Sequence, residues 1–215
     1  TSIASGGNGS YSYQWQSSTN NSTWSNINGA TGTSYNTGGL TSAVYYRVIS
    51  SSNGVSVNGN SVLVSVYPQL ISGSISASPS TVNYGANSII SVSGVTGGNG
   101  SYSYQWQSSS DNSTWSNISG ATGTTYTTGA LISGIYYRVV TTSNGVVVSS
   151  SSVLVGVYPQ LTSGTLSATP STVNYNTSSV ISVSGVTGGN GSYSYQWQSS
   201  SDNITWSNIS GATGS

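Results

Sequence analysis

Apolar and polar residues alternate along most of this chain, with the period of two that is typical of β-strands. The segment 88–95 reads Ser-Ile-Ile-Ser-Val-Ser-Gly-Val, and Tyr102, Tyr104 and Trp106 share one face of the segment that follows. No segment shows a helical period of useful length. The pattern therefore predicts an all-β chain.

One stretch of the chain contains a complete series of such segments, separated by turn residues. The sequence Ser-Asn-Gly-Val at 143–146 predicts a tight hairpin, and the Gly-Gly-Asn-Gly at 97–100 predicts another turn. Pro79 interrupts the first strand, which suits the edge of a sheet. We expect strands at 74–82, 88–95, 102–107, 115–118, 124–131, 135–142 and 146–157.

The chain is built from internal repeats with a period of 91 residues. The motif Gly-Gly-Asn-Gly-Ser-Tyr-Ser-Tyr-Gln-Trp-Gln occurs three times, at 6–16, 97–107 and 188–198. Residues 6–67 match 97–158 at 45 of 62 positions, and 94–123 match 185–214 at 29 of 30. Such similarity predicts a recently duplicated array within a longer protein. We expect a partial repeat without its first strands at 1–69, a complete one at 70–160, and a partial one without its last strands at 161–215.

The composition excludes most catalytic chemistry. Ser, Gly, Thr and Asn make up 126 of the 215 residues, and the only charged side chains are Arg47, Arg138, Asp111 and Asp202. Because His, Glu, Lys and Cys are absent, the chain lacks an ordinary general base, a thiolate and a Schiff-base amine. It also lacks the ligands of a zinc site, the clustered carboxylates of a calcium site, and the basic surface that nucleic acid requires. We therefore expect neither an enzyme nor a cofactor.

The same composition favours a folded chain over a disordered one. The net charge is zero, and the chain has 16 Tyr and 6 Trp among many Val and Ile, whereas disordered chains have few aromatic residues and high net charge. The chain contains no run of about 18 apolar residues, so no membrane span is predicted. No signal peptide is visible. Without Lys or Cys, neither an isopeptide bond nor a disulfide can cross-link the strands.

About 90 residues per repeat, seven or so short strands and a Trp on the third strand predict an immunoglobulin-like β-sandwich. In the 135–142 strand, Tyr137 shares a face with Val139, so Tyr137 rather than Tyr136 is favoured as the buried corner tyrosine. Val139 with Ile90 or Val92 would fill the space that a disulfide occupies in many such sandwiches.

Four stretches of the second repeat and its junction form a distinctive series. They are Gly-Gly-Asn-Gly-Ser-Tyr-Ser-Tyr-Gln-Trp-Gln at 97–107, Asp-Asn-Ser-Thr-Trp-Ser-Asn-Ile at 111–118, Tyr-Tyr-Arg-Val at 136–139 and Val-Tyr-Pro-Gln-Leu at 157–161. This series resembles the Ig-like repeats of giant prokaryotic surface adhesins and extracellular filament proteins. The resemblance implies a secreted stalk or adhesin array at the cell surface. It implies partners among neighbouring repeats, other copies of the protein or surface glycans, but no particular ligand.

Several aromatic and charged side chains are candidates for binding. Trp106 is expected in the core, whereas Trp115 either packs under a loop or forms a sugar-stacking platform. Arg138 is expected to reach solvent or stack on a neighbouring Tyr. Asp111 is expected to form hydrogen bonds with the backbone of its own loop. Asn20 occupies the equivalent position in the first repeat, so a carboxylate is not needed there. The platform hypothesis, a carbohydrate-binding module, would use Trp24, Trp115 and Trp206.

Asn-x-Ser/Thr sequons are slightly more frequent than composition predicts. With 20 Asn and 78 Ser or Thr in 215 residues, chance gives about seven. Ten are present, most of them in predicted loops, and they leave N-glycosylation open. They are Asn8, Asn20, Asn21, Asn99, Asn112, Asn117, Asn176, Asn190, Asn203 and Asn208.

The junctions between repeats are short, which predicts a semi-rigid rod. Only Pro159, Gln160 and Leu161 separate the last strand of one repeat from the next, and Pro restricts the backbone on both sides. Tyr158 and Leu161, like Tyr67 and Leu70 before them, are expected to pack at the junction. A repeat would be about 35–40 Å long. The function expected is a stalk of spacers, and the second alternative is a filament subunit whose strands pair between chains.

Overall fold

The structure, a computed structural model, describes residues 5–214, and no helix is present among them. The chain divides into two compact units, Thr1–Ile71 with Thr96–Ser101, and Ser72–Val95 with Tyr102–Ser215. Strands, turns and loops make up both units, so the all-β prediction is confirmed. The repeat boundaries at 69/70 and 160/161 stay predictions.

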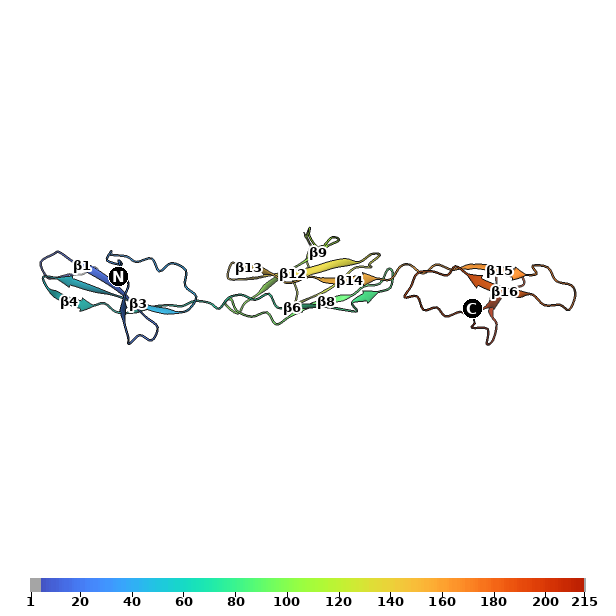
Figure 1. Ribbon diagram of the computed structural model, residues 1–215, viewed down its shortest axis with the longest axis horizontal. Helices are drawn as coiled ribbons and strands as arrows, with labels where there is room; N and C mark the ends of the chain where they lie inside the picture. The colour runs from blue at the N-terminus through green and yellow to red at the C-terminus, as the bar shows by residue number, and fades with distance from the viewer. Residues whose placement is uncertain (1–4, 215) are drawn as a thin grey trace. The chain divides into compact units, whose positions relative to one another are not determined.

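Residues 74–157 of the second unit form two facing sheets (Figure 1). The larger sheet has the order β10-β9-β12-β14-β7, with β13 also paired to β12, and the smaller sheet has the order β11-β8-β6. Every pairing is antiparallel except that of β14 with β7. The strands are β6 (Ser74–Ser78), β7 (Thr81–Val82), β8 (Ile89–Ser93), β9 (Ser103–Ser109), β10 (Ser116–Asn117), β11 (Thr125–Thr127), β12 (Ile135–Ser143), β13 (Val146–Ser149) and β14 (Val153–Val157).

Pro79 lies where the chain passes from one sheet to the other. The strand predicted at 74–82 is two strands: β6 pairs with β8 in the smaller sheet, and β7 pairs with β14 in the larger one. Because Pro has no N–H to donate, it fits the gap between the two ladders. The expected interruption thus becomes a change of sheet.

The single strand predicted at 146–157 is wrong. β13 and β14 are separate, although both pair with β12. Ser150 lies in the gap, where its N–H donates to the Val139 carbonyl (2.9 Å) and its Oγ accepts from the Val139 N–H (3.0 Å). The serine side chain takes the place of a backbone acceptor, which interrupts the ladder. The alternation of Val residues cannot reveal this exchange.

The β12–β13 hairpin is confirmed. Asn144 and Gly145 have φ values of 48° and 81°, as the tight turn with two left-handed residues requires. Asn and Gly tolerate this region better than other residues, so the dipeptide fixes the turn and the register that follows from it.

The core of this sandwich surrounds Trp106, which is 0% exposed. Its ring N–H donates to the Gly123 carbonyl (2.9 Å), so burial leaves no polar atom of the indole unpaired. Tyr137 is buried and Tyr136 only half-buried, which confirms the choice made from parity. The remaining buried apolar residues come from both sheets and adjoining loops: Val82, Ile90, Val92, Ala121, Leu131, Val139 and Val155.

The first unit contains one sheet, in the order β2-β1-β3-β4 with β5 also paired to β3. Trp15 lies opposite Val48 in β1 and β3, as Trp106 lies opposite Val139 in β9 and β12. The pairings of the second repeat therefore recur 91 residues earlier. The strands are β1 (Ser12–Ser18), β2 (Ser25–Asn26), β3 (Val44–Ser52), β4 (Val55–Asn58) and β5 (Val62–Val64).

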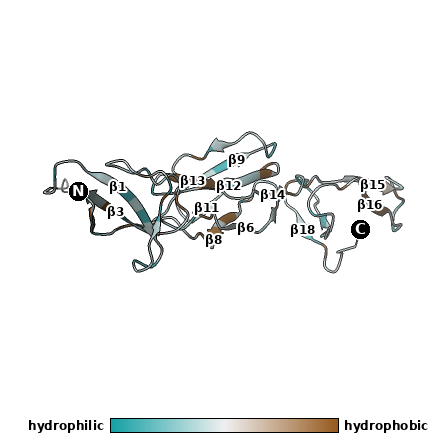
Figure 2. Cartoon of the chain, turned by 60° about the vertical axis from the view of Figure 1, so that its left-hand side comes forward, coloured by the Kyte–Doolittle hydropathy of each residue, from teal (hydrophilic) through white to brown (hydrophobic). Residues whose placement is uncertain are grey.

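Residues 162–214 form two small antiparallel sheets. β15 (Thr165–Thr169) pairs with β16 (Val180–Ser184), and β17 (Gln198–Ser199) pairs with β18 (Ser207–Asn208). These pairings match those of β6 with β8 and of β9 with β10. Figure 2 colours much of β8 and β16 as hydrophobic, in agreement with their Ile and Val residues.

Replacing Trp106 with Ala should lower the free energy of unfolding of the second repeat by about 3–5 kcal/mol, because a large buried side chain leaves a cavity. Urea denaturation followed by circular dichroism measures the change. The exposed Ile132→Ala is the control and should alter stability little. Equal effects of the two substitutions would contradict the assigned core.

Replacing Thr141 with Val should stabilise the same repeat by about 1–2 kcal/mol. Thr141 is 0% exposed, and within residues 5–214 its Oγ1 is the one buried side-chain polar atom found without a hydrogen-bond partner. Val has a similar shape without the hydroxyl. Thermal unfolding should show a higher midpoint for Thr141→Val than for the neighbouring Thr142→Val. A midpoint of Thr141→Val below that of Thr142→Val would show that the Thr141 hydroxyl has a hydrogen-bond partner.

Candidate functional site

The outer face of the larger sheet carries a chain of polar and aromatic contacts. The Arg138 guanidinium lies 4.4 Å from the centroid of the Trp115 ring. Its Nε donates to Gln107 Oε1 (2.7 Å), and Gln107 Nε2 donates to Asn117 Oδ1 (2.8 Å). Arg138 thus stacks on this Trp rather than on a neighbouring Tyr, and its side chain is half-buried, so the expectation that it reaches solvent is not contradicted.

The strand pairings bring these residues together. Arg138 lies opposite Gln107 in the β12–β9 register, and Gln107 lies opposite Asn117 in the β9–β10 register. Cross-strand neighbours on one face are close enough for such contacts. Sequence reasoning missed Gln107 and Asn117, although both recur in every repeat together with the Trp.

The first unit repeats the arrangement. The Arg47 guanidinium lies 4.3 Å from the centroid of the Trp24 ring, and its Nε donates to Gln16 Oε1 (2.7 Å). Gln16 Nε2 donates to Asn26 Oδ1 (2.8 Å). Nearly equal geometry in two units shows that the sequence specifies this cluster, which we call the Arg–Trp cluster: Arg138, Trp115, Gln107 and Asn117, with their equivalents.

The Arg–Trp cluster limits what the predicted sugar platform can do. Trp24 and Trp115 are half-buried, and a guanidinium covers one face of each ring. A sugar could stack only on the other face. Trp206 is 51% exposed, and its neighbours keep the Gln198–Asn208 hydrogen bond (2.9 Å). Trp24 and Trp115 therefore each leave at most one ring face for a sugar.

Asp111 organises its own loop, as predicted. Its Oδ1 accepts from the N–H groups of Ser113 and Thr114, both at 2.8 Å, and from Ser109 Oγ at 2.8 Å. These hydrogen bonds, with that of Thr114 the largest cause, hold the pKa of the Asp111 carboxyl well below its usual range. Asn20 makes the corresponding contacts in the first unit, so the loop needs an oxygen acceptor rather than a charge.

The ten sequon asparagines are all exposed. Eight lie in turns or loops, whereas Asn117 and Asn208 lie on β10 and β18, and the first of these falls within the strand expected at 115–118. The side chains of both also accept hydrogen bonds from the Gln residues opposite them. Glycosylation of all ten stays a prediction.

The linker between repeats binds the Gly-Gly-Asn-Gly turn of the repeat that follows it. In the first unit, Gly98 N–H donates to the Pro68 carbonyl (2.8 Å), and Ile71 N–H donates to the Thr96 carbonyl (2.9 Å). A β-carbon on Gly97 would overlap the Gln69 carbonyl oxygen, so this position needs Gly both for its φ of 79° and for space. We call this contact the linker–turn lock.

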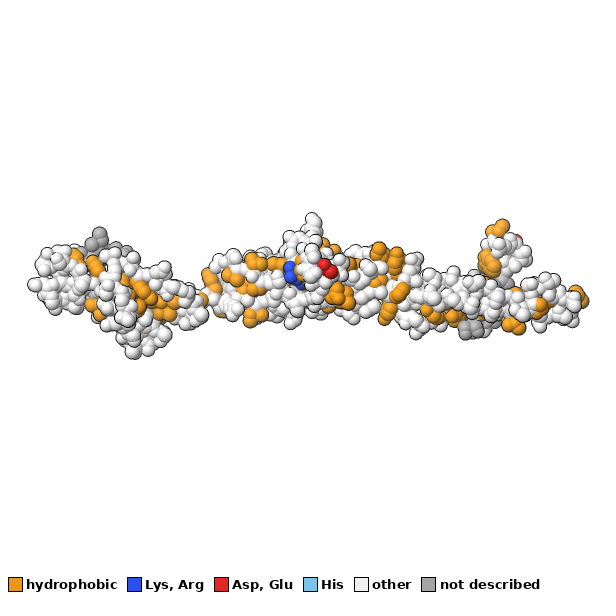
Figure 3. Space-filling view, turned by 45° about the horizontal axis from the view of Figure 1, so that its top comes forward, with side chains coloured by type: hydrophobic (Ala, Val, Ile, Leu, Met, Phe, Trp, Pro, Cys, Tyr) orange, Lys and Arg blue, Asp and Glu red, His pale blue; other side chains and the backbone are white. Residues whose placement is uncertain are grey.

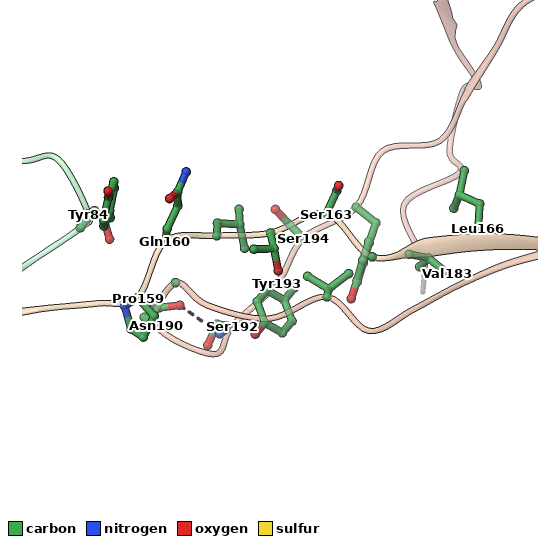
Figure 4. Close-up of a pocket in the computed structure, with 17 residues that line it drawn as sticks. Tyr84, Pro159, Gln160, Ser163, Leu166, Val183, Asn190, Ser192, Tyr193 and Ser194 are labelled. Atoms are coloured by element: carbon green, nitrogen blue, oxygen red, sulfur yellow. Dashed lines mark hydrogen bonds between the residues drawn. The ribbon is translucent and has the colours of Figure 1, made fainter. Parts of the chain in front are cut away.

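The same lock recurs at the next junction (Figure 4). Gly189 N–H donates to the Pro159 carbonyl (2.8 Å), and Thr162 N–H donates to the Thr187 carbonyl (2.9 Å). A β-carbon on Gly188 would overlap the Gln160 carbonyl oxygen. The turn itself is held by Asn190 Oδ1, which accepts from Ser192 N–H at 3.0 Å.

The apolar residues of the two linkers do not behave alike. Leu70 is 4% exposed, as expected, but Leu161 is 61% exposed and Tyr67 is 62% exposed. The prediction that all the junction Tyr and Leu residues pack is therefore wrong. Backbone hydrogen bonds, rather than a shared apolar contact, are what the two junctions have in common.

Charged groups are sparse on the face shown in Figure 3, where blue and red occupy only small spots. In residues 5–214, no three His, Cys, Asp or Glu side chains lie close enough together to hold a metal ion. The described part of the chain also contains no helix that could cross a membrane.

Comparison with known families gives one match. The model of the family described as Domain of unknown function (DUF8696) matches residues 1–68, 71–159 and 162–215. The chain belongs to this family. Its three tandem DUF8696 segments each contain the Trp, Gln and Asn of the Arg–Trp cluster, and the expectation of tandem repeats is confirmed. A search of curated proteins found no match to the chain.

Replacing Asp111 with Asn should leave the second repeat folded at neutral pH and make its stability less sensitive to acid. A carboxylate whose pKa is lowered by folding stabilises the protein above its unfolded pKa of about 3.9, and this contribution is lost as pH falls through the folded pKa. Urea denaturation at neutral and strongly acidic pH measures the difference. Asp202→Asn is the matched control outside this repeat, and an unchanged acid sensitivity in Asp111→Asn would contradict the assignment.

Proposed function

We propose that this DUF8696 chain is a non-enzymatic spacer segment of an extracellular surface protein, in which each repeat is an immunoglobulin-like sandwich. The strand order of residues 74–157 supports such a fold. One sheet has β8 between β6 and β11, and the other has β9, β12 and β14 in succession. The buried Trp106 on β9 and buried Tyr137 on β12 occupy the places expected for that fold.

The observation that carries the spacer function is the linker–turn lock. A flexible tether would have free backbone groups, but here the carbonyls of Pro68 and Pro159 accept hydrogen bonds from the following turns. Pro also fixes φ at the same position. The proposed result is a junction that transmits orientation from one repeat to the next.

The repeated glycines agree with this proposal. Gly97 and Gly188 lie where any β-carbon would overlap the linker backbone, whereas Gly94 and Gly185 have positive φ but open space around the missing β-carbon. The first pair is thus needed for the close approach of two segments. This provides a physical reason for the recurrence of the Gly-Gly-Asn-Gly motif in each repeat.

The neutral, Ser- and Asn-rich surface supports an extracellular location. Ordinary Asp and Arg side chains keep their charges between about pH 5 and 9, so the charge of such a surface changes little in that range. We propose that neighbouring repeats are the main partners. Surface glycans remain a lesser proposal, because an Arg covers one face of Trp24 and Trp115.

Chains with increasing numbers of repeats should lengthen almost linearly in small-angle scattering, by about 35–40 Å per repeat. Gly97→Ala should break the lock at one junction, add flexibility there and shorten the mean end-to-end distance. Gly94→Ala is the matched control, because it also places Ala at positive φ but meets no backbone.

Compact particles of the unsubstituted chain would contradict the spacer function itself. Equal scattering by Gly97→Ala and Gly94→Ala, with linear growth preserved, would contradict only the role of the lock. The two failures are therefore distinguishable.

A further inference from the structure

The hydrogen bonds of the Arg–Trp cluster run in one fixed direction. A guanidinium has donors only, so the Gln107 oxygen must be the atom that faces Nε of Arg138 (2.7 Å). The Gln107 amide nitrogen then faces Asn117, whose side-chain oxygen must be the acceptor (2.8 Å). Arg138 thereby sets the orientation of both amides.

This direction leaves donors at both ends of the cluster. The side-chain oxygens of Gln107 and Asn117 each accept a hydrogen bond within it. The Nη groups of Arg138 and the Nδ2 group of Asn117 have no acceptor among residues 5–214. Asn117 is exposed and Arg138 is half-buried. A surface that offers donors and a positive charge suits an anion.

The guanidinium is also held in place before any ligand arrives. The Trp115 ring covers one of its faces at 4.4 Å, and the hydrogen bond from Nε to Gln107 fixes the direction of its plane. A group that is already ordered loses less entropy when it binds. The two Nη groups of a planar guanidinium match the two oxygens of a carboxylate.

The first unit offers the same donors in the same arrangement. Arg47 Nε donates to Gln16 (2.7 Å), and Gln16 Nε2 donates to Asn26 Oδ1 (2.8 Å). The Arg47 Nη and Asn26 Nδ2 groups have no acceptor in the described part of the chain. The chain has two Arg and no Lys, so both of its cationic side chains occupy this one position of the repeat.

We propose that the two Arg–Trp clusters bind the carboxylates of a uronic acid polysaccharide. The Nη groups of Arg138 hold one carboxylate. Asn117 lies two strand spacings away across β9, about 10 Å, and its Nδ2 donates to a hydroxyl of the same polysaccharide. Such a polymer carries the same acid and the same hydroxyls along its length, so it can meet equal clusters on successive repeats and gain avidity.

The proposal places the glycan contact on the guanidinium rather than on the ring face of a Trp. It does not rest on the spacer function, because neither the length nor the stiffness of the chain enters the argument.

Asp111 makes the two clusters unequal. It lies in the loop between β9 and β10 that also carries Trp115, whereas the first unit has the neutral Asn20 at its position. A negative charge in this loop opposes the approach of a carboxylate to Arg138. We therefore expect tighter binding at Arg47 than at Arg138, and a gain of about twofold with Asp111→Asn.

Surface plasmon resonance tests the proposal, with the 215-residue chain made without N-glycosylation and passed over immobilised polygalacturonate. We expect saturable binding that weakens as salt is added. Fully methyl-esterified polygalacturonate keeps the sugars but lacks the charge, so it should bind little. Polyglutamate, an acidic polypeptide, should bind more weakly than polygalacturonate because it lacks the hydroxyls.

The decisive variant combines Asn26→Asp with Asn117→Asp. Each Asp keeps an oxygen to accept from Gln but replaces the free donor with a negative oxygen, so binding should fall by about tenfold or more. The matched control combines Asn53→Asp with Asn144→Asp. It adds the same two charges in the β3–β4 and β12–β13 turns, outside the clusters, and should bind as the unsubstituted chain does.

Arg47→Lys with Arg138→Lys is a second test, should the Asp variant fail the check of its fold by circular dichroism. It keeps the charge but loses the paired Nη groups, so binding should fall by about severalfold.

Absence of binding to polygalacturonate, equal binding to its methyl ester, or equal effects of the two Asp pairs would overturn the proposal. Unchanged binding by the Lys pair would do the same. Equal or tighter binding to polyglutamate would overturn the assignment to a sugar acid.

Discussion

Burial of one tryptophan between two sheets is the interaction on which the repeat depends. Trp106 contributes the largest wholly buried side chain, and the residues around it come from both sheets. Its ring N–H donates to the Gly123 carbonyl. Its backbone N–H donates to the Ala121 carbonyl, and its backbone carbonyl accepts from the Ile118 N–H. The loop after β10 is therefore tied to the same residue that fills the core. The equivalent hydrogen bonds around Trp15 and Trp197 show that this local frame forms even where the opposite sheet does not cover it.

In residues 5–214, side-chain hydrogen bonds rather than ion pairs connect the strands and loops. Gln105 Nε2 donates to the carbonyls of both Trp106 and Ile118, and Gln107 connects Asn117 to Arg138. Even the loop acid can be exchanged for Asn20 with its backbone contacts kept. Such contacts do not depend on ionisation, apart from those of the few charged groups. The side-chain chemistry thus agrees with a proposed role in which the protein holds a shape rather than performs a reaction.

Repetition places the same contact at each junction. The carbonyls of Pro68 and Pro159 meet the same turn at the same distance of 2.8 Å, even though the Leu residues beside them differ in burial. A backbone contact of this kind tolerates side-chain drift, because it requires only Pro in the linker and Gly in the turn. This is a property that the proposed array of near-identical spacers would need.

The sequence by itself determined the β-strands, the hairpin at Asn144-Gly145 and the inward position of Tyr137, because these depend on local turn chemistry and on a period of two. It also determined the repeats and the buried place of Trp106. Only the tertiary structure decided the change of sheet at Pro79, the strand break at Ser150 and the stacking of Arg138 on Trp115. Each of these depends on which strand lies alongside, and the alternation of apolar and polar residues does not determine the order of strands in a sheet. Trp15 and Trp106 have the same neighbours in sequence yet differ in burial, because burial is set by the opposite sheet.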